Sequence, residues 1–400
     1  MKKIYRILSL ALALCLCLSL AACGGKTGGT DSKGGDTPAP GDSDMTEEEV
    51  KALVQEIAEK AAWDDMAYES GIIDRVTEII PVDGEYTIRI GTPTGGRNEQ
   101  NYVMALFEAY IEASTAGKVQ VELYPASQLG TAAQMIQGVL DGSITGVTIP
   151  LDYFYTYAPA AGIVSVPFMF TKGSVQAARI FQNDPTMDDY LKSKGFWPIA
   201  WLYEHSYTIL ANKAITSMND FKGMKIWCLP SVLGQKELEA YGASPTLMDP
   251  SEIALAMQNR TVDGAFTGVT FFSNQGLHES AKYLNKLPLK SLPCVMMFGA
   301  QFMESLPENL RNHIIEAGRM IIDDYEKAYI TSSIERSVSA ILEKCEEVIP
   351  SEELLAQMKE ASMPVHEFFK SVDEDCAKMY EKMAELIAQD DAAGGEALPY

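Results

Sequence analysis

The sequence predicts an α/β protein with two lobes, followed by long C-terminal helices that span and contact both. Strand-like and helix-like segments alternate from Tyr86 onward, and the alternation starts again at Phe196. Strands alternating with helices of about ten to fifteen residues indicate parallel β-α-β units. From Glu308 the pattern is almost wholly helical, as in a helix that spans a molecule. With 400 residues, 47% of them apolar, the chain has room for two ordinary domains.

The net charge argues against several classes of partner. The chain carries 32 Lys and Arg against 55 Asp and Glu, a formal charge of −23. Binding to a nucleic-acid backbone or to anionic lipid headgroups needs clustered basic residues, so we expect neither partner. Seven cysteines and four histidines are too scattered for a zinc framework, and we expect no cofactor and no metal.

Residues 1–23 have the pattern of a secretory leader, with a basic start, an apolar run over 7–20 and small residues before Cys23. The run is shorter than the ~20 apolar residues that a transmembrane helix needs. The end of the leader resembles the lipobox of bacterial lipoproteins, whose cysteine becomes the lipidated first residue; the alternative is an ordinary cleavage site. Residues 24–44 lack large apolar residues, which predicts a flexible tether. We therefore expect an extracytoplasmic protein, in the periplasm or at the cell surface, held to the membrane only by a lipid on Cys23.

Residues 45–84 are expected to form a helical N-terminal extension. An amphipathic helix is predicted over 45–67, with Thr46 as its N-cap and three glutamates in its first turn, where the helix dipole favours acidic side chains. The extension either covers one lobe or holds the tether, and the sequence does not decide between these roles.

The first lobe is predicted over 85–206, together with part of 295–330. Alternating apolar residues and turn signals place its strands and helices. The expected strands are 86–90, 119–123, 144–149 and 196–202, and the expected helices are 101–113 and 131–140.

The second lobe is predicted over 207–294, and the spanning and C-terminal helices over 295–400. The predicted strands are 207–211, 225–229 and one starting at 262–266, and the predicted helices are 234–241 and 251–258. The C-terminal helices are expected over 308–347, interrupted at 331–333, and over 351–359 and 365–388. The four cysteines of this part are expected to be buried or free thiols.

Five short segments of the chain, in order, carry motifs. Residues 121–130 include Tyr-Pro-Ala-Ser-Gln-Leu-Gly, and residues 166–170 read Val-Pro-Phe-Met-Phe. Residues 220–226 read Asp-Phe-Lys-Gly-Met-Lys-Ile, and two further segments lie at 241–258 and 262–265. Together these segments resemble motifs of the solute-binding proteins of TRAP transporters (tripartite ATP-independent periplasmic transporters), the DctP-like group. The resemblance implies a two-lobed fold like that of periplasmic binding proteins, capture of a small molecule between the lobes, and delivery to a TRAP-type permease.

The chain departs from this family where most characterised members hold a carboxylate. The arginine that ends the family's Lys-Ile-Arg motif is replaced by Trp227, and the arginine usual near residues 204–208 is missing. An arginine suits a carboxylate because it donates two parallel hydrogen bonds, whereas an indole can stack on a ring or face a cation. We therefore expect a neutral or cationic ligand with a ring or several hydroxyls. A carboxylate held by Arg97 is the alternative.

The candidate ligand-binding residues lie in the loops after the strands and at the family's ligand positions. Glu204 and His205 are further polar candidates, with a surface position as the alternative, and Phe170 is equally compatible with a core position. The candidates are Arg97, Asn98, Glu99, Tyr153, Tyr155, Phe170, Tyr207, Trp227 and Thr267.

No catalytic motif is present in the sequence. It has no Gly-x-Ser-x-Gly elbow, no His-Glu-x-x-His pair and no phosphate-binding loop, so we do not expect an enzyme. A binding protein that serves a membrane sensor or an ABC importer remains an alternative, because only its partner would differ.

Overall fold

The computed structural model describes residues 45–61, 63–204, 206–248, 250–325, 329–395 and 397. The predicted leader, the tether, Cys23 and His205 lie outside the described residues. None of the helices in the described part of the chain has the length and apolar character needed to cross a bilayer.

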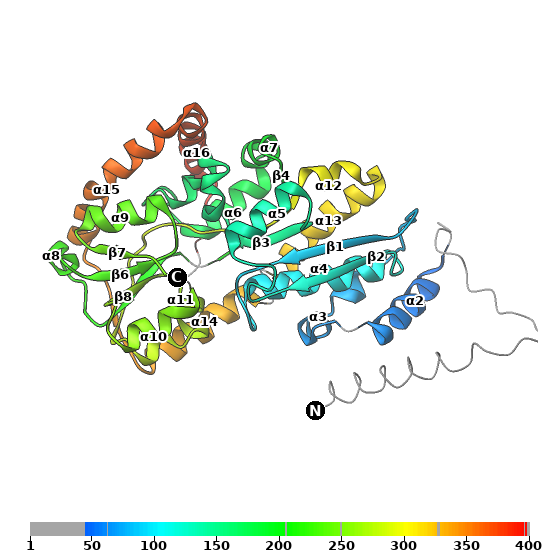
Figure 1. Ribbon diagram of the computed structural model, residues 1–400, viewed down its shortest axis with the longest axis horizontal. Helices are drawn as coiled ribbons and strands as arrows, with labels where there is room; N and C mark the ends of the chain where they lie inside the picture. Colours follow the sequence, from blue (N-terminus) through cyan, green and yellow to red (C-terminus); the bar gives the residue numbers. More distant parts are fainter. Residues whose placement is uncertain are drawn as a thin grey trace, which may run out of the picture. The chain divides into compact units, whose positions relative to one another are not determined.

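Two β-sheets organise the fold, as the sequence predicts (Figure 1). The first sheet has five strands in the order β2-β1-β3-β10-β4, and the second has six in the order β11-β9-β5-β8-β6-β7. The first comprises β1 (Tyr86–Gly91), β2 (Val119–Tyr124), β3 (Gly146–Pro150), β4 (Phe196–Leu202) and β10 (Cys294–Gly299). The second comprises β5 (Thr208–Ala211), β6 (Lys225–Cys228), β7 (Ser244–Thr246), β8 (Gly264–Thr267), β9 (Tyr283–Asn285) and β11 (Glu346–Val348).

Each sheet has a parallel part formed by β-α-β units. Strand β1 pairs in parallel with β2 and β3, and β6 pairs in parallel with β7 and β8. The antiparallel pairing was not predicted: β10, which the sequence did not predict, lies between β3 and β4, and β5, which it did predict as a strand, lies between β8 and β9. Strand β10 is buried along its whole length, so its sequence shows no alternation.

Helices pack against each sheet. Those of the first sheet are α4 (Glu99–Ser114), α5 (Ala132–Asp141), α6 (Gly173–Asn183), α7 (Thr186–Ser193), α12 (Ala300–Ser305) and α13 (Glu308–Tyr325), with the 3-10 turns η2 (Leu151–Thr156) and η3 (Pro159–Ser165). Those on the side of the second sheet are α8 (Met218–Phe221), α9 (Val232–Tyr241), α10 (Ile253–Gln258), α11 (Val269–Asn274) and α14 (Thr331–Leu342), with η4 (Pro250–Glu252) and η5 (Leu277–Glu279).

The N-terminal extension packs on the first lobe. Helices α2 (Glu47–Lys60) and α3 (Asp65–Ser70) and the turn η1 (Ile72–Arg75) all contact α4. The predicted N-cap is confirmed, because Thr46 and Glu49 form a reciprocal capping box. The single predicted helix is in fact two, and Asp64 caps the second by accepting a hydrogen bond from the Met66 amide.

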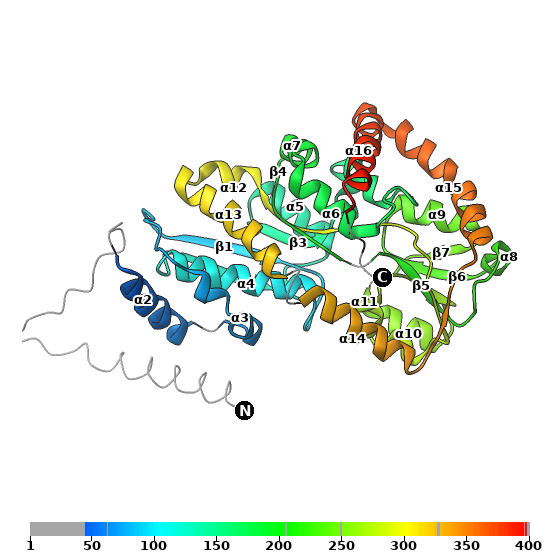
Figure 2. The ribbon, with the colours of Figure 1, turned by 180° about the vertical axis from the view of Figure 1, so that it is seen from behind.

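Several connections run between the sheets. Residues 203–207 lead from β4 to β5, and residues 286–293 return from β9 to β10. The two segments are paired, because the Tyr207 amide donates to the Lys290 carbonyl at 3.0 Å. Figure 2 shows α13 and α14 running from beside the first sheet to beside the second. The predicted two-lobed α/β fold with spanning helices is thus confirmed.

The boundaries of the C-terminal helices differ from the prediction. Residues 331–333 begin α14 and do not interrupt a helix. Helix α15 (Glu352–Val372) continues through Pro364, and the break comes at Asp373, which caps α16 (Glu374–Ala392). Helix α15 packs on α9, whereas α16 packs on α6 and η3, so this pair also contacts both lobes.

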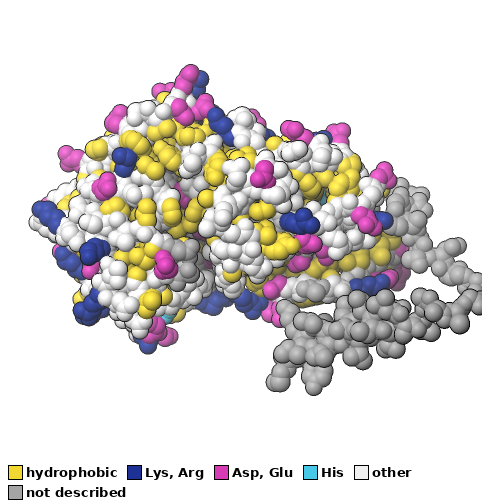
Figure 3. All heavy atoms as spheres, viewed as in Figure 1, with side chains coloured by type: hydrophobic (Ala, Val, Ile, Leu, Met, Phe, Trp, Pro, Cys, Tyr) yellow, Lys and Arg dark blue, Asp and Glu magenta, His cyan; other side chains and the backbone are white. Residues whose placement is uncertain are grey.

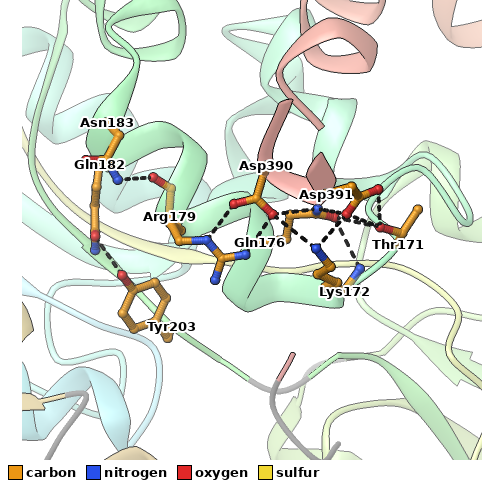
Figure 4. A network of polar contacts seen from close by, with 9 residues as sticks. All are labelled: Thr171, Lys172, Gln176, Arg179, Gln182, Asn183, Tyr203, Asp390 and Asp391. Atoms are coloured by element: carbon orange, nitrogen blue, oxygen red, sulfur yellow. Dashed lines mark hydrogen bonds and ion pairs between the residues drawn. The ribbon is translucent and has the colours of Figure 1, made fainter. Parts of the chain in front are cut away.

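A polar network holds the end of α16 on α6 (Figure 4). Arg179 donates to Asp390 through Nε at 2.7 Å and through Nη2 at 2.8 Å, and Lys172 reaches Asp391 at 2.8 Å. The hydrogen bond from Arg179 is the main cause that lowers the pKa of Asp390 to about 2.

Acidic and basic side chains are interspersed over the face of the molecule shown in Figure 3. The four described cysteines are buried, free thiols, as predicted; they are Cys228, Cys294, Cys345 and Cys376.

Candidate functional site

A cavity of about 80 Å³ lies between the two lobes, larger than a single water molecule needs. Its lining comes from the loop after β1, the ends of β3, β6 and β8, the crossing segments and helix α11. The carboxyl ends of parallel strands and the junctions of domains are the usual places for small-molecule sites in α/β proteins. The cavity is therefore the candidate ligand site.

The loop after β1 is held in place by the turn after β2. The amides of Ala126 and Ser127 donate to the carbonyls of Thr94 and Thr92 at 2.9 and 3.1 Å. Both donor residues have positive φ, 54° and 57°, which is costly for residues other than glycine. A Cβ on Gly95 would lie 3.0 Å from the Ala126 Cβ, so glycine permits the close approach of the two loops. The Tyr-Pro-Ala-Ser motif thus shapes one wall of the cavity.

Glu99 stands at the start of α4 and lines the cavity. Asn98 caps this helix, because its side chain accepts a hydrogen bond from the Asn101 amide. The Glu99 side chain is buried and accepts a hydrogen bond from the Ser333 hydroxyl of α14 at 3.2 Å. Burial raises the pKa of its carboxyl, an effect that Ser333 and Thr270 oppose by hydrogen bonding.

Glu204 brings a second buried carboxyl to the same cavity. It follows the apolar strand β4 and accepts hydrogen bonds at Oε1 from Gln100 Nε2 at 3.1 Å and from Cys294 Sγ at 2.8 Å. Burial, followed by the negative charge of Glu99, raises the pKa of Glu204 to about 8. No Lys or Arg is found among the described residues of the lining.

Aromatic rings form another part of the wall. Tyr153, Tyr207 and Phe271 line the cavity. The Tyr207 hydroxyl is buried without a well-formed hydrogen bond among the described residues, although the neighbouring Thr267 side chain interacts with it. Trp227 lies behind this wall: its indole is fully buried, stacks on Phe271 at 5.5 Å and donates to the Met248 carbonyl at 3.1 Å.

The structure brings together five of the nine predicted site residues. The five that line the cavity are Asn98, Glu99, Tyr153, Tyr207 and Thr267. Arg97, Tyr155, Phe170 and Trp227 are not among the lining residues. The Arg97 side chain is 59% exposed and pairs with Glu69 of the N-terminal extension.

Besides Trp227, which lies behind the wall, the remaining two predicted residues, Tyr155 and Phe170, pack against neighbouring residues. Tyr155 is half-buried against Gly162, where a Cβ would lie 2.5 Å from its ring. Phe170 packs edge-on against Phe181 and lines a second cavity that shares Tyr207 with the first. The presence of Phe170 in a family motif is therefore compatible with the core position that the sequence left open.

Sequence reasoning left several lining residues out of its candidate set. They are Gln100, Thr270, Phe271 and Asn274; Glu204, which the sequence offers only as a further polar candidate, lines the cavity as well. One signal was available for Glu204, an acid directly after an apolar strand and therefore at its carboxyl end. No comparable signal marked α11, which was not predicted as a helix.

The crossing segment carries a buried ion pair close to the cavity. Lys290 Nζ lies 3.1 Å from Asp152 Oδ2 and 3.3 Å from the Ser165 hydroxyl, and both charged side chains are almost fully buried. The same ammonium group lies 4.8 Å from the centre of the Tyr207 ring. Within the described residues, no group of three or more His, Cys, Asp or Glu side chains is placed to hold a metal ion.

Residues 94–372 match the family described as bacterial extracellular solute-binding protein, family 7. The chain is 25% identical over 232 residues to the uncharacterized protein YiiZ of Salmonella typhimurium, covering 57% of this chain and 70% of that protein. It is 22% identical over 269 residues to the 2,3-diketo-L-gulonate-binding periplasmic protein YiaO of Escherichia coli, covering 66% of this chain and 80% of that protein.

Solved structures share the fold. A TRAP periplasmic solute-binding protein from Sulfitobacter with bound β-D-galacturonate has a TM-score of 0.70 at 19% identity, covering 75% of this chain and 99% of that chain. One from Desulfovibrio salexigens with bound orotic acid also has a TM-score of 0.70, at 23% identity, covering 76% of this chain and all of that chain.

Proposed function

The chain belongs to the bacterial extracellular solute-binding proteins of family 7, and from this premise we propose that it captures one small ligand in the cavity between its lobes and delivers it to a TRAP-type membrane permease. The cavity's lining from both lobes supports this proposal. A ligand that contacts both lobes favours their closure, because the closed form gains contacts that the open form lacks.

The ligand is neutral or cationic and is not a carboxylate clamped by arginine. The absence of Lys and Arg from the described lining carries this part of the proposal. Proteins of similar fold include one solved with the sugar acid β-D-galacturonate, and a carboxylate buried here without a cation would face the acids Glu99 and Glu204. Burying a charge without a counter-ion is costly, and an ionised form of either acid would add repulsion to that cost. Arg97 is exposed and paired with Glu69, which weighs against it as a replacement clamp.

The protein acts by reversible capture and carries out no chemical step. It works outside the cytoplasm, tethered by residues 24–44 to a lipid on Cys23. In a Cys23→Ser variant, labelling with a radioactive fatty acid and recovery in the membrane fraction should both be lost. Unchanged labelling of that variant would refute the anchor and leave the binding function untouched.

A thermal-shift screen of the purified protein tests the binding function. The panel holds organic acids, sugars, nucleosides and amines, and a ligand at a hundred times its Kd adds about 2.7 kcal/mol to the free energy of unfolding. Phe271→Ala in the cavity wall should abolish the shift caused by a hit. Phe302→Ala is the matched control, because this half-buried ring packs on Phe298 away from the cavity. Equal loss of the shift in both variants would contradict the assigned site.

A further inference from the structure

We propose that the cavity takes a protonated amine carried on a ring-bearing molecule, with Glu99 and Glu204 as its counter-ions. This inference rests on the function proposed above and assigns it a ligand class. The two carboxyls line one cavity, come from different parts of the fold and are both buried. A buried carboxyl ionises at low cost only beside a cation, and the described lining supplies none.

The hydrogen bonds of Glu204 leave one of its oxygens available. Among the described residues, both donors to this side chain, Gln100 Nε2 and Cys294 Sγ, reach Oε1. Gln100 is itself held, because its Oε1 accepts a hydrogen bond from the Thr94 hydroxyl. Among the described residues no donor reaches Oε2 of Glu204, so this oxygen can accept a hydrogen bond from a ligand, and an ammonium group supplies three donors.

The aromatic wall suits the same ligand. A cation is attracted to the faces of aromatic rings, and Tyr153, Tyr207 and Phe271 all border the cavity. The ring that carries the amine can stack on the same side chains. The buried Tyr207 hydroxyl, which lacks a well-formed hydrogen bond, offers a further polar contact. Acids and aromatic rings in one cavity form a site for an organic cation.

The charges around the two acids do not neutralise them. The negative charge of Asp152 also raises the pKa of Glu204, whereas the hydrogen bond from the Cys294 thiol lowers it. The charge that favours the ionised form of Glu99 is that of Arg336 on α14. Arg336 does not line the cavity, and its guanidinium lies 5.9 Å from the centre of the Tyr329 ring. Lys290 is paired with Asp152. His205, next to Glu204 in the chain, lies outside the described residues.

Proton linkage separates this ligand class from its rival. In the empty cavity burial keeps Glu204 protonated up to a pKa of about 8. An amine pairs with the ionised form, so its binding releases a proton and its affinity rises with pH. A ligand carboxylate would instead accept a hydrogen bond from the protonated acids, and its affinity would fall with pH. If binding releases one proton, the affinity for the amine rises by nearly tenfold per pH unit below the pKa of Glu204.

Two series of compounds test the ligand class by titration calorimetry on the purified protein. D-glucosamine, D-glucose and D-glucuronate differ mainly in one group, and so do tyramine, tyrosol and 4-hydroxyphenylacetate. We expect the amine of at least one series to bind at least tenfold more tightly than its neutral and anionic counterparts. Its affinity should rise by about three- to tenfold per unit between pH 5.5 and 7.5, with proton release measured in buffers of different ionisation enthalpy.

Variants then assign the effect to the two acids. Glu204→Gln and Glu99→Gln should each weaken amine binding at least tenfold, and Glu204→Gln should flatten its pH dependence. Glu108→Gln is the control: Glu108 lies on the same helix as Glu99, burial also raises its pKa to about 8, and it does not line the cavity. The control should bind as the wild-type protein does.

The outcomes distinguish this inference from the function on which it rests. Tighter binding of D-glucuronate or 4-hydroxyphenylacetate, with affinity falling as pH rises, would overturn the amine assignment and uphold solute binding. Binding of neither amine at millimolar concentration would also overturn it, even if the wider panel finds another ligand. Failure of that whole panel would overturn the proposed function itself.

Discussion

Replacing Trp227 by alanine separates a structural role from a ligand contact. The indole is fully buried, stacks on Phe271 and donates a hydrogen bond to the Met248 carbonyl. Truncating a buried tryptophan to alanine costs about 3–5 kcal/mol, which includes the cavity left behind. The lost hydrogen bond adds about 1 kcal/mol. We therefore expect Trp227→Ala to lower the free energy of unfolding by about 4–6 kcal/mol.

Urea unfolding of the ligand-free protein measures this loss. Trp227→Phe should lose less than half as much, because a phenyl ring fills part of the space and can still stack on Phe271. Trp197→Ala is the control: the Trp197 side chain is half-buried at the surface under Lys192, so its truncation should cost less. In Trp227→Ala, Phe271 loses its support, so ligand affinity should fall together with stability.

A different result would restore the interpretation drawn from sequence. The sequence predicts that Trp227 contacts the ligand, and such a residue could be truncated with little loss of stability. If Trp227→Ala unfolds at the wild-type urea concentration but no longer binds ligand, the structural role is refuted.

Three further perturbations test the charges of the fold. Asp390→Asn removes the partner of Arg179 and should lower the free energy of unfolding by about 1–2 kcal/mol at pH 7. Because the pKa of Asp390 is lowered to about 2, the advantage of the wild-type protein should persist to about pH 4 and disappear as the pH falls toward 2. Calorimetry at a series of pH values measures this change. Lys290→Met leaves Asp152 as an unpaired buried charge and should cost about 3–5 kcal/mol by urea unfolding, with partial recovery when Asp152→Asn is added. Arg97→Ala should change stability by less than about 1 kcal/mol and leave ligand affinity unchanged in calorimetry, since its ion pair is largely exposed; a tenfold loss of affinity would restore Arg97 as a ligand clamp.

Local patterns predicted the parallel half of the fold well. Strands β1, β2 and β6 alternate or end at a turn residue, and helix α2 begins at a capping box that its sequence shows. Strand β10 was missed because it is buried on both faces, and a short apolar run does not distinguish a strand from a buried helix. The break of the last helices was misplaced: the sequence predicts it between 351–359 and 365–388, in a stretch that contains Pro364. The chain instead continues through Pro364, and Asp373 supplies the next cap.

The site was less predictable because its residues meet through tertiary packing. The loop after β1 and the residues after β3 were predicted as candidates and do line the cavity, since the carboxyl ends of parallel strands share one edge of a sheet. Arg97 belongs to the same loop, but the N-terminal extension offers Glu69 as a partner, and that extension lies outside the segment matched by the family. Sequence alone could not show that Trp227 would lie one layer behind the wall.

The buried lysine of the crossing segment sharpens the electrostatic argument for the ligand. The fold does place a cation near the cavity, but Lys290 is held by Asp152 and Ser165, and its ammonium group faces the Tyr207 ring. Tyr207 lines the cavity, whereas Lys290 does not. With Lys290 neutralised in this way, the protonation of Glu99 and Glu204 determines whether the cavity is neutral or negative. A carboxylate ligand that used Lys290 as its counter-ion would need Lys290 to leave Asp152, and this exchange would leave a second acid buried without a partner.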